Sequence, residues 1–442
     1  MADRYDWVLR GAAVFTPKGL VSADIGVSGG RIAKIGDIRP GSGAVEDSLS
    51  GLTVLPGVID TQVHFREPGA EHKEDLATGT AAAAKGGVTA ICDMPNTKPN
   101  TTSPEALADK VARGKRRAWV DYAFYLGATA ENAADLAAWE NLPGCCGIKV
   151  FMGSSTGTLL VDEQAALETI FATGKRRVAV HAEDETRLKA RYALVAEGAP
   201  VPMHPVWRDE ETATIAVRRL IDLARRSGRA THCLHVTSAG EMELLRDRPA
   251  NMTVEVTPQH LTLAAPDAYD RLGTFAQMNP PIRDARHRDA LWAALKAGVV
   301  SCLGSDHAPH TREEKAQPYP KSPSGMPGVQ TLVPVMLDHV NAGRLGLSDF
   351  VRLASANPAR MFGMAGRGAI AEGYRADFTI VDMGAERTIA DDWIASRCGW
   401  TPFAGMRVTG WPVITAVGGR VVMREDALIG TPKGAPIAFD PV

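Results

Sequence analysis

Short apolar runs alternate along the chain with segments of helical spacing. ETATIAVRRLIDLARRSG (211–228) and HRDALWAALKAG (287–298) are two such segments, and Gly298 ends the second, as glycine often ends a helix. Eight β units alternating with helices over roughly 250 residues are typical of a (β/α)8 TIM barrel. The sequence therefore predicts an α/β fold with a TIM barrel. The eight predicted strands are 54–65, 87–94, 120–128, 147–152, 177–183, 231–237, 252–257 and 299–308.

The two ends of the chain have a different pattern. Residues 1–53 and 366–442 alternate apolar and polar positions around glycines, as β-strands do. Neither end is long enough to form a stable sheet comfortably alone. We expect both ends to pair into one small β-sandwich domain beside a barrel of residues 54–365. The segment 311–328 is rich in Pro, Gly and charge, so we expect a loop above the barrel mouth. Whether this loop closes over a ligand stays open.

Composition narrows the class of protein. Of 442 residues, 45% are hydrophobic and 23% charged, which suits a large buried core. A net charge of -2 gives no electrostatic case for binding nucleic acid or an anionic membrane, so local cations must bind any anionic substrate. Six cysteines without a C-x-x-C pair predict free thiols. The N-terminal stretch lacks the apolar run of a signal peptide, and no segment approaches about 18 uninterrupted apolar residues. We expect a cytoplasmic protein.

Five predicted strands carry a candidate metal ligand at or near the carboxyl end, where TIM barrels have their active sites. A lone strand histidine is more often structural, but five coincidences in one chain favour a metal site. Alternation along the first strand also places Gln62, His64 and Arg66 on one face. By the same alternation His232 faces away from the cavity that His235 faces. The five candidate ligands are His64, Lys149, His181, His235 and Asp306.

Seven short motifs carry a resemblance to a known family. They are PGVIDTQVHFREPG (56–69), DMPNT (93–97), GIKVFMG (147–153), VHAED (180–184), LHVTS (234–238), MNPPIR (278–283) and SDHAPH (305–310). The first resembles the opening metal motif of the amidohydrolase superfamily, and its HFREPG portion is similar to the dihydroorotase family. The resemblance extends over nearly the whole chain. It implies a TIM-barrel enzyme that reversibly hydrolyses the small molecule dihydroorotate to N-carbamoyl-aspartate in pyrimidine biosynthesis, as a homodimer.

The resemblance also implies one or two zinc ions. His181 and His235 would hold one ion, and His64 and Asp306 the other. Lys149 matches a lysine that forms a carbamate with carbon dioxide; a free ammonium has no lone pair for a cation. An ion-paired buried lysine is the alternative. Asp306 would act as general base and then as general acid.

The substrate-binding residues come from the same resemblance. Arg66, Asn96 and His310 match positions that bind the substrate carboxylate, and an arginine fork suits that anion. Asn279 matches a position that contacts the ring amide. Each of these residues could alternatively be a turn or capping residue.

Two positions depart from the family pattern. Gln62 replaces the first histidine of the H-x-H pair, and an amide oxygen is a poorer zinc ligand than imidazole. Gln259 stands where another histidine is common, which we interpret as minor. Three outcomes of the first change are open: two metals with a looser site, one metal, or lost catalysis. The rival hypotheses are an allantoinase or hydantoinase, which need no carboxylate clamp, and a non-catalytic partner of aspartate transcarbamoylase.

Overall fold

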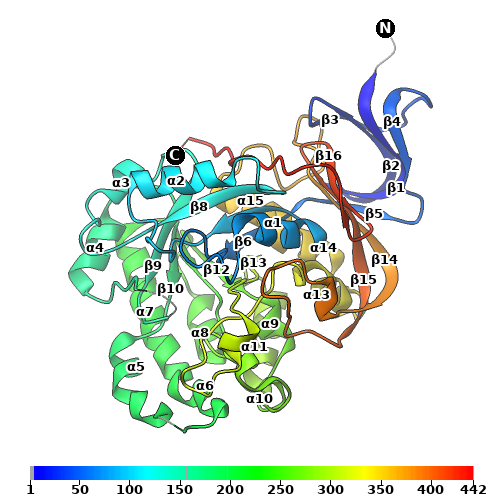
Figure 1. The fold of residues 1–442 in the computed structure, drawn as a ribbon. Helices are drawn as coiled ribbons and strands as arrows, with labels where there is room; N and C mark the ends of the chain where they lie inside the picture. Colours follow the sequence, from blue (N-terminus) through cyan, green and yellow to red (C-terminus); the bar gives the residue numbers. More distant parts are fainter. Residues whose placement is uncertain (1–3, 156–157, 197, 442) are drawn as a thin grey trace.

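The computed structural model describes residues 4–155, 158–196 and 198–441, and in these ranges eight parallel strands form a barrel (Figure 1). Each strand pairs with the next along the chain. A parallel bridge between Val63 and His307 brings the first and last strands together, and His64 N–H donates to His307 O at 2.7 Å. The predicted TIM barrel is confirmed. Its strands are β6 (Val58–Val63), β7 (Val88–Asp93), β8 (Asp121–Gly127), β9 (Cys145–Phe151), β10 (Val178–His181), β11 (Thr231–Cys233), β12 (Met252–Val256) and β13 (Cys302–Leu303).

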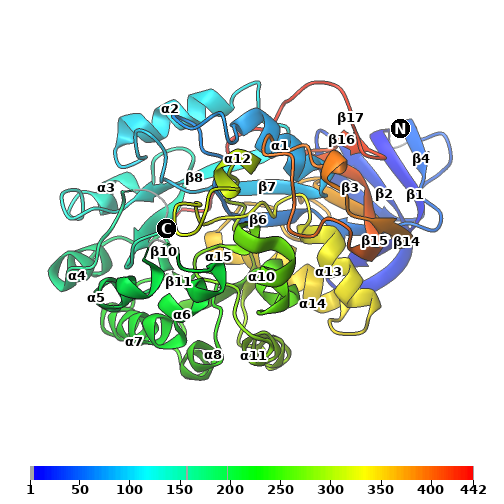
Figure 2. The ribbon, with the colours of Figure 1, turned by 60° about the horizontal axis from the view of Figure 1, so that its bottom comes forward.

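Helices surround the barrel (Figures 1 and 2). Side chains at the loop–helix junctions fix where several of them begin, because Asp209, Ser238 and Asp284 each accept a first-turn backbone N–H. The predicted helices 211–228 and 287–298 are confirmed, and Gly298 follows the second with φ of 76°. The longer helices are α1 (Leu76–Lys85), α2 (Pro104–Gly114), α4 (Gln164–Ala172), α7 (Glu210–Ser227), α8 (Ala239–Arg246), α11 (Ala285–Lys296) and α13 (Leu332–Asn341). The shorter ones are α3 (Leu136–Trp139), α5 (Glu185–Arg191), α6 (His204–Trp207), α9 (Pro258–Thr262), α10 (Asp267–Leu272), α12 (Arg312–Lys315), α14 (Leu347–Val351) and α15 (Asn357–Phe362).

The first predicted strand, 54–65, was wrong as a single element. It divides at Gly57 into β5 (Thr53–Pro56), which belongs to a second sheet, and β6 of the barrel. A Cβ at Gly57 would collide with the Thr89 side chain, so glycine is required where the chain passes between the two sheets. Buried apolar residues continue on both sides of this junction, which is why the apolar pattern alone did not reveal it.

Both chain ends meet in the second sheet, as the sequence predicted (Figure 1). Its order is β17-β16-β15-β14-β5-β1-β2-β3, with β4 paired to β1. The two ends join where β5 pairs antiparallel with β14, and Trp7, Ile25, Phe378 and Ile414 share one apolar core. The strands are β1 (Tyr5–Thr16), β2 (Gly19–Ser28), β3 (Arg31–Gly36), β4 (Gly43–Ser48), β5, β14 (Phe378–Thr388), β15 (Arg407–Val417), β16 (Arg420–Arg424) and β17 (Ala427–Leu428). Beyond β17 the chain returns to the barrel, where Pro436 bridges to Tyr122.

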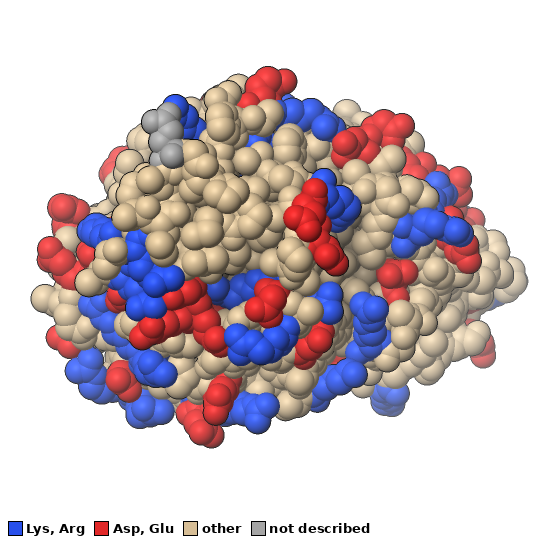
Figure 3. Space-filling view, turned by 90° about the horizontal axis from the view of Figure 1, so that it is seen from below, with Lys and Arg blue, Asp and Glu red and all other residues tan. Residues whose placement is uncertain are grey.

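The surface and the thiols agree with the composition. Figure 3 shows a face on which acidic and basic side chains are interspersed. All six cysteines are buried and free, as predicted. Among the described residues, no helix combines the length and the apolar character that crossing a membrane requires.

Candidate active site

A cavity of about 350 Å³ lies where the barrel strands end. Its walls come from the ends of β6, β9, β10 and β11 and from the loops that follow the strands. Ser324 and Gly325 of the 311–328 segment also reach it, so the predicted loop contributes to the cavity wall. The lining residues are Gln62, His64, Arg66, Asn96, Lys149, Phe151, Ser155, His181, His235, Asn279, Asp306, Ala308, Ser324 and Gly325.

Three of the lining residues have strained backbone. Among the residues that the structure describes, six non-glycine residues have positive φ, and three of them are Arg66 (62°), His235 (37°) and Asp306 (44°). Such conformations cost about 1–3 kcal/mol each and persist where the surrounding structure imposes them. All three follow a barrel strand closely, so the strain accompanies the turn that directs these side chains into the cavity.

His181 and His235 present ring nitrogens to each other. His181 Nδ1 lies 3.1 Å from His235 Nε2, and burial lowers the pKa of both imidazoles, which favours the neutral form that binds metals. Two nitrogens on one tetrahedral zinc, at bonds of ~2.0–2.1 Å, would be about 3.3 Å apart. His181 Nε2 lies 2.8 Å from Glu183 Oε2, and Arg208 pairs with the same carboxylate. Glu183 therefore lies beside the first histidine, in the place that carboxylates take next to metal-binding histidines.

Lys149 is buried beside these histidines. In the described part of the chain its amine forms no ion pair, and it lies 4.3 Å from the centre of the Phe151 ring. Burial lowers the pKa of Lys149 to about 7, so a large part of the amine is neutral at neutral pH. A neutral amine is the form that can add to carbon dioxide. The setting suits the carbamate better than the alternative of an ion-paired lysine.

His64, Asp306 and Gln62 meet on the opposite side of the cavity. His64 Nε2 lies 3.3 Å from Asp306 Oδ1, and Gln62 Nε2 donates to the same oxygen at 2.9 Å. Asn96 Oδ1 lies 2.7 Å from His64 Nδ1, which leaves Nε2 of a neutral ring as the acceptor that faces Asp306. Burial raises the pKa of Asp306 to about 7, a value suited to proton transfer near neutrality. Gln62 Oε1 is buried and has no hydrogen-bond partner among the residues that the structure describes.

Arg66 brings a buried positive charge to this cavity. Its Nε donates to Pro309 O at 3.1 Å and its Nη2 lies 3.3 Å from His310 Nε2, and neither partner is an anion. Burial lowers the pKa of Arg66 only to about 10, so it remains charged at neutral pH. His310 does not line the cavity; it lies behind Arg66, with burial lowering its pKa to about 3. A buried guanidinium that has no directly paired carboxylate among the described residues favours an anionic ligand.

Asn279 faces the cavity from the loop after α10. Its Oδ1 lies 2.9 Å from His204 Nε2 and its Nδ2 3.5 Å from Ser155 Oγ. Sequence reasoning did not identify Glu183 or Ser155. The signal for Glu183 was its position two residues after His181, on the same face of the strand end; for Ser155 we find no comparable signal.

The donor set fits a metal centre. Two converging imidazoles, a lysine amine without a counter-ion, and a third histidine beside a carboxylate all face one cavity. Nitrogen and carboxylate ligands of this kind are those that zinc prefers. We therefore regard the cavity as a candidate metal-dependent active site.

Comparisons with known proteins agree with this geometry. The profile of the amidohydrolase family matches residues 53–422. A dihydroorotase from Halobacterium salinarum is 37% identical over 92% of this chain and 94% of its own length. A dihydroorotase from Pyrococcus furiosus is 35% identical over 95% of this chain and 93% of its own length. Among solved structures, the L-hydantoinase (dihydropyrimidinase) from Arthrobacter aurescens superposes with a TM-score of 0.91 at 28% identity, over 98% of this chain and 99% of its own.

Proposed function

The chain belongs to the amidohydrolase family, and from this premise we propose that it is a dihydroorotase. In one direction such an enzyme hydrolyses the ring amide of dihydroorotate to N-carbamoyl-aspartate; in the other it closes the ring, the direction of pyrimidine synthesis. Several curated relatives named dihydroorotase, 33–37% identical over almost the full chain, support this assignment. The hydantoinase and dihydropyrimidinase structures share the fold at lower identity, 28% in each of two superpositions.

One observation carries the choice of substrate: Arg66 lines the cavity as a buried cation, and no carboxylate among the described residues forms a direct ion pair with it. Dihydroorotate has a carboxylate on its ring, whereas hydantoin, allantoin and dihydrouracil do not. A guanidinium can hold a carboxylate through two parallel N–H bonds, which fixes orientation as well as charge. His310 contacts the guanidinium from behind and Asn96 lies in the same wall, so we assign them to positioning the clamp and its anion.

The remaining residues divide the reaction between them. Asp306 is the proton carrier: its carboxylate takes a proton from the attacking water, and the protonated acid returns it to the leaving ring nitrogen. Gln62 holds the Asp306 oxygen at 2.9 Å, which keeps the base in one orientation. Asn279 has an amide that can both donate to and accept from the ring amide. In the reverse direction the same residues close the ring.

We assign the metal to zinc, in one or two ions: His181 and His235 would hold one ion, His64 and Asp306 the other, and Lys149 would contribute as a carbamate. A bound zinc ion would polarise the amide carbonyl and lower the pKa of water toward neutrality. Gln62 leaves three protein ligands on the second side, and three ligands with an open position describe a catalytic zinc site. We further propose a cytoplasmic homodimer.

Gln62 also favours a second candidate, a non-catalytic partner of aspartate transcarbamoylase, because it replaces an imidazole ligand. The other candidate ligands all line the cavity, which a decaying site would not preserve. A Gln62→His variant separates the two candidates. We expect it to bind more zinc with less than a tenfold change in turnover. A much larger gain would mean that the native site does not serve catalysis.

The direct test is turnover by the purified protein, supplied with zinc and bicarbonate, on dihydroorotate beside allantoin and dihydrouracil. We expect hydrolysis of dihydroorotate alone. Activity only on a carboxylate-free substrate would move the protein to a hydantoinase-type function. Inactivity on all three, in folded and metal-loaded protein, would favour the non-catalytic candidate.

A further inference from the structure

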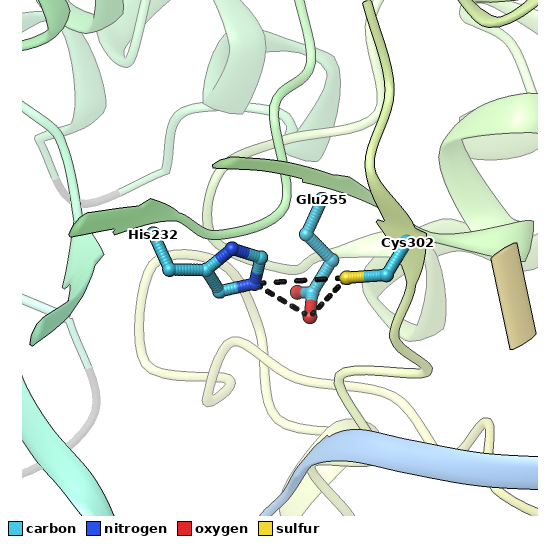
Figure 4. Close-up of side chains that lie close together, drawn as sticks. All are labelled: His232, Glu255 and Cys302. Atoms are coloured by element: carbon cyan, nitrogen blue, oxygen red, sulfur yellow. Dashed lines mark hydrogen bonds and ion pairs between the residues drawn. The ribbon is translucent and has the colours of Figure 1, made fainter. Parts of the chain in front are cut away.

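A second group of metal-type side chains lies inside the barrel wall, outside the cavity (Figure 4). His232, Glu255 and Cys302 come from the adjacent strands β11, β12 and β13, and each is 0% exposed. None of them lines the active-site cavity, and His232 faces away from it as the sequence predicted. In the part of the chain that the structure describes, this is the one group of three or more His, Cys, Asp and Glu side chains whose ligand atoms all lie within 4.8 Å of one another.

The three ligand atoms surround a common point. His232 Nε2 lies 3.3 Å from Glu255 Oε2, and Cys302 Sγ lies 3.8 Å from that nitrogen and 3.9 Å from that oxygen. These separations are long for direct hydrogen bonds. A circle through three atoms so spaced has a radius of about 2.1 Å, within the ~2.0–2.3 Å range of zinc bonds to N, O and S. The spacing leaves room for one ion in the plane of the three ligand atoms.

The hydrogen bonds around His232 are compatible with a lone pair on Nε2 that faces the centre of the three ligand atoms. Thr253 has one hydroxyl hydrogen, which it donates to Thr231 O at 3.1 Å, and its oxygen accepts from Arg177 Nη1 at 2.9 Å. With that hydrogen on Thr231 O, the remaining contact of this hydroxyl, 2.8 Å from His232 Nδ1, has Nδ1 as the donor. In a neutral ring Nε2 is then an acceptor facing a carboxylate oxygen. A positive charge between these two acceptors, either a proton on Nε2 or a bound metal ion, would offset the repulsion of their lone pairs.

We propose that His232, Glu255 and Cys302 form a buried structural site for a zinc-class divalent cation. A neutral imidazole, a carboxylate and a thiolate carry two negative charges, which such an ion neutralises inside the barrel. Thr61 donates to Glu255 Oε2 at 2.9 Å, and a Cβ at Gly304 would collide with that carboxylate, so neighbours on both sides fix its place. The ion would tie β11, β12 and β13 together. Glu255 Oε1 also accepts His235 N–H at 3.4 Å, next to the active site.

Cobalt substitution tests this site apart from the active site. The active-site donor set contains no sulfur, so a thiolate-to-cobalt charge-transfer band in the near ultraviolet would come from a cysteine. The site is closed to solvent, so the protein is produced in cells grown with cobalt and without added zinc. We expect the full-length wild type to show the band. Cys302→Val should lose it, while Cys145→Val, which removes another buried strand thiol, should keep it.

Metal retention gives a second readout that does not depend on activity. A chelator removes ions from the open active-site cavity faster than it removes an ion from a fully enclosed site. After dialysis against a chelator, wild-type protein should therefore keep about one ion per chain, at the buried site. Cys302→Val and Glu255→Gln, shown by circular dichroism to be folded, should keep none, and Cys145→Val should keep one. Wild-type protein without the thiolate band and without a retained ion would overturn the proposal. A protonated His232 paired with Glu255 would then occupy the same place.

Discussion

Replacing Arg66 by lysine tests the carboxylate clamp. Arg66 is 5% exposed, and its guanidinium already donates to Pro309 O at 3.1 Å while reaching into the cavity. Lysine keeps the charge but concentrates it on one ammonium. That group cannot offer two parallel N–H bonds to an anion while also satisfying the carbonyl. The variant therefore removes the geometry of the clamp and leaves its charge.

The expected loss follows from one charge-assisted hydrogen bond, which contributes about 1.5–3 kcal/mol. At 1.4 kcal/mol for each factor of ten, kcat/KM for dihydroorotate should fall about 10- to 150-fold. Inhibition by N-carbamoyl-aspartate should weaken by a similar factor. Inhibition by N-carbamoyl-β-alanine, which lacks the α-carboxylate, should change less than threefold.

The assay measures the ring-opened product by chromatography, together with the two inhibition constants. Arg283→Lys is a matched control, because Arg283 is also buried but donates to Thr237 Oγ1 and Arg208 O rather than facing the cavity. We expect it to leave the ratio of the two inhibition constants unchanged. If Arg66→Lys weakened both inhibitors equally, the arginine would support the site without binding the carboxylate, and the choice of substrate would lose its basis.

Three further changes have expected outcomes. Lys149→Met should lower turnover by about 10³-fold or more and abolish any stimulation by bicarbonate, because the carbamate ligand cannot form; residual stimulation would contradict this. Asp306→Asn should lower kcat about 10²- to 10⁴-fold. Asp306 has a raised pKa of about 7, so its carboxylate forms as the pH rises toward that value and wild-type hydrolysis should increase over the same range. A bound cation would shift this range to lower pH. The Asp306→Asn variant should not show the increase. Lys110→Met should lower the free energy of unfolding by about 3–5 kcal/mol in urea, since it leaves the fully buried Asp93 unpaired; a loss below 1 kcal/mol would refute the pairing.

The barrel and the candidate ligands could be predicted together from the sequence, because the barrel determines where the ends of its strands lie. Parallel strands end at one edge, so residues at successive strand ends converge whatever the details of the helices. His64, Lys149, His181, His235 and Asp306 were predicted on that ground together with the resemblance, and all line one cavity. The convergence of these five side chains is therefore confirmed, and their roles as metal ligands stay predictions.

Other features depend on contacts that no local pattern contains. The division of 54–65 at Gly57 depends on Thr89, far along the chain. His310 is placed behind Arg66 by its contacts with Ser324 O and the Arg66 guanidinium. Strand alternation could indicate only that His232 faces away from the cavity. Which side chains it meets is decided by the register of β12 and β13, which the sequence pattern does not specify.

The contacts of Gln62 give a physical reason why the departure from the family pattern should still allow catalysis. An imidazole at this position would be a further ligand of the ion that we assign to His64 and Asp306. The amide instead donates to Asp306 Oδ1 at 2.9 Å and shares that oxygen with His64 Nε2 at 3.3 Å. The carboxylate thus keeps a fixed orientation, as a base must when it takes a proton from one atom and returns it to another. In the proposed mechanism, glutamine therefore supplies one metal ligand fewer than histidine would and adds one hydrogen bond to the proposed proton carrier, so a reduced ligand set is compatible with proton transfer by Asp306.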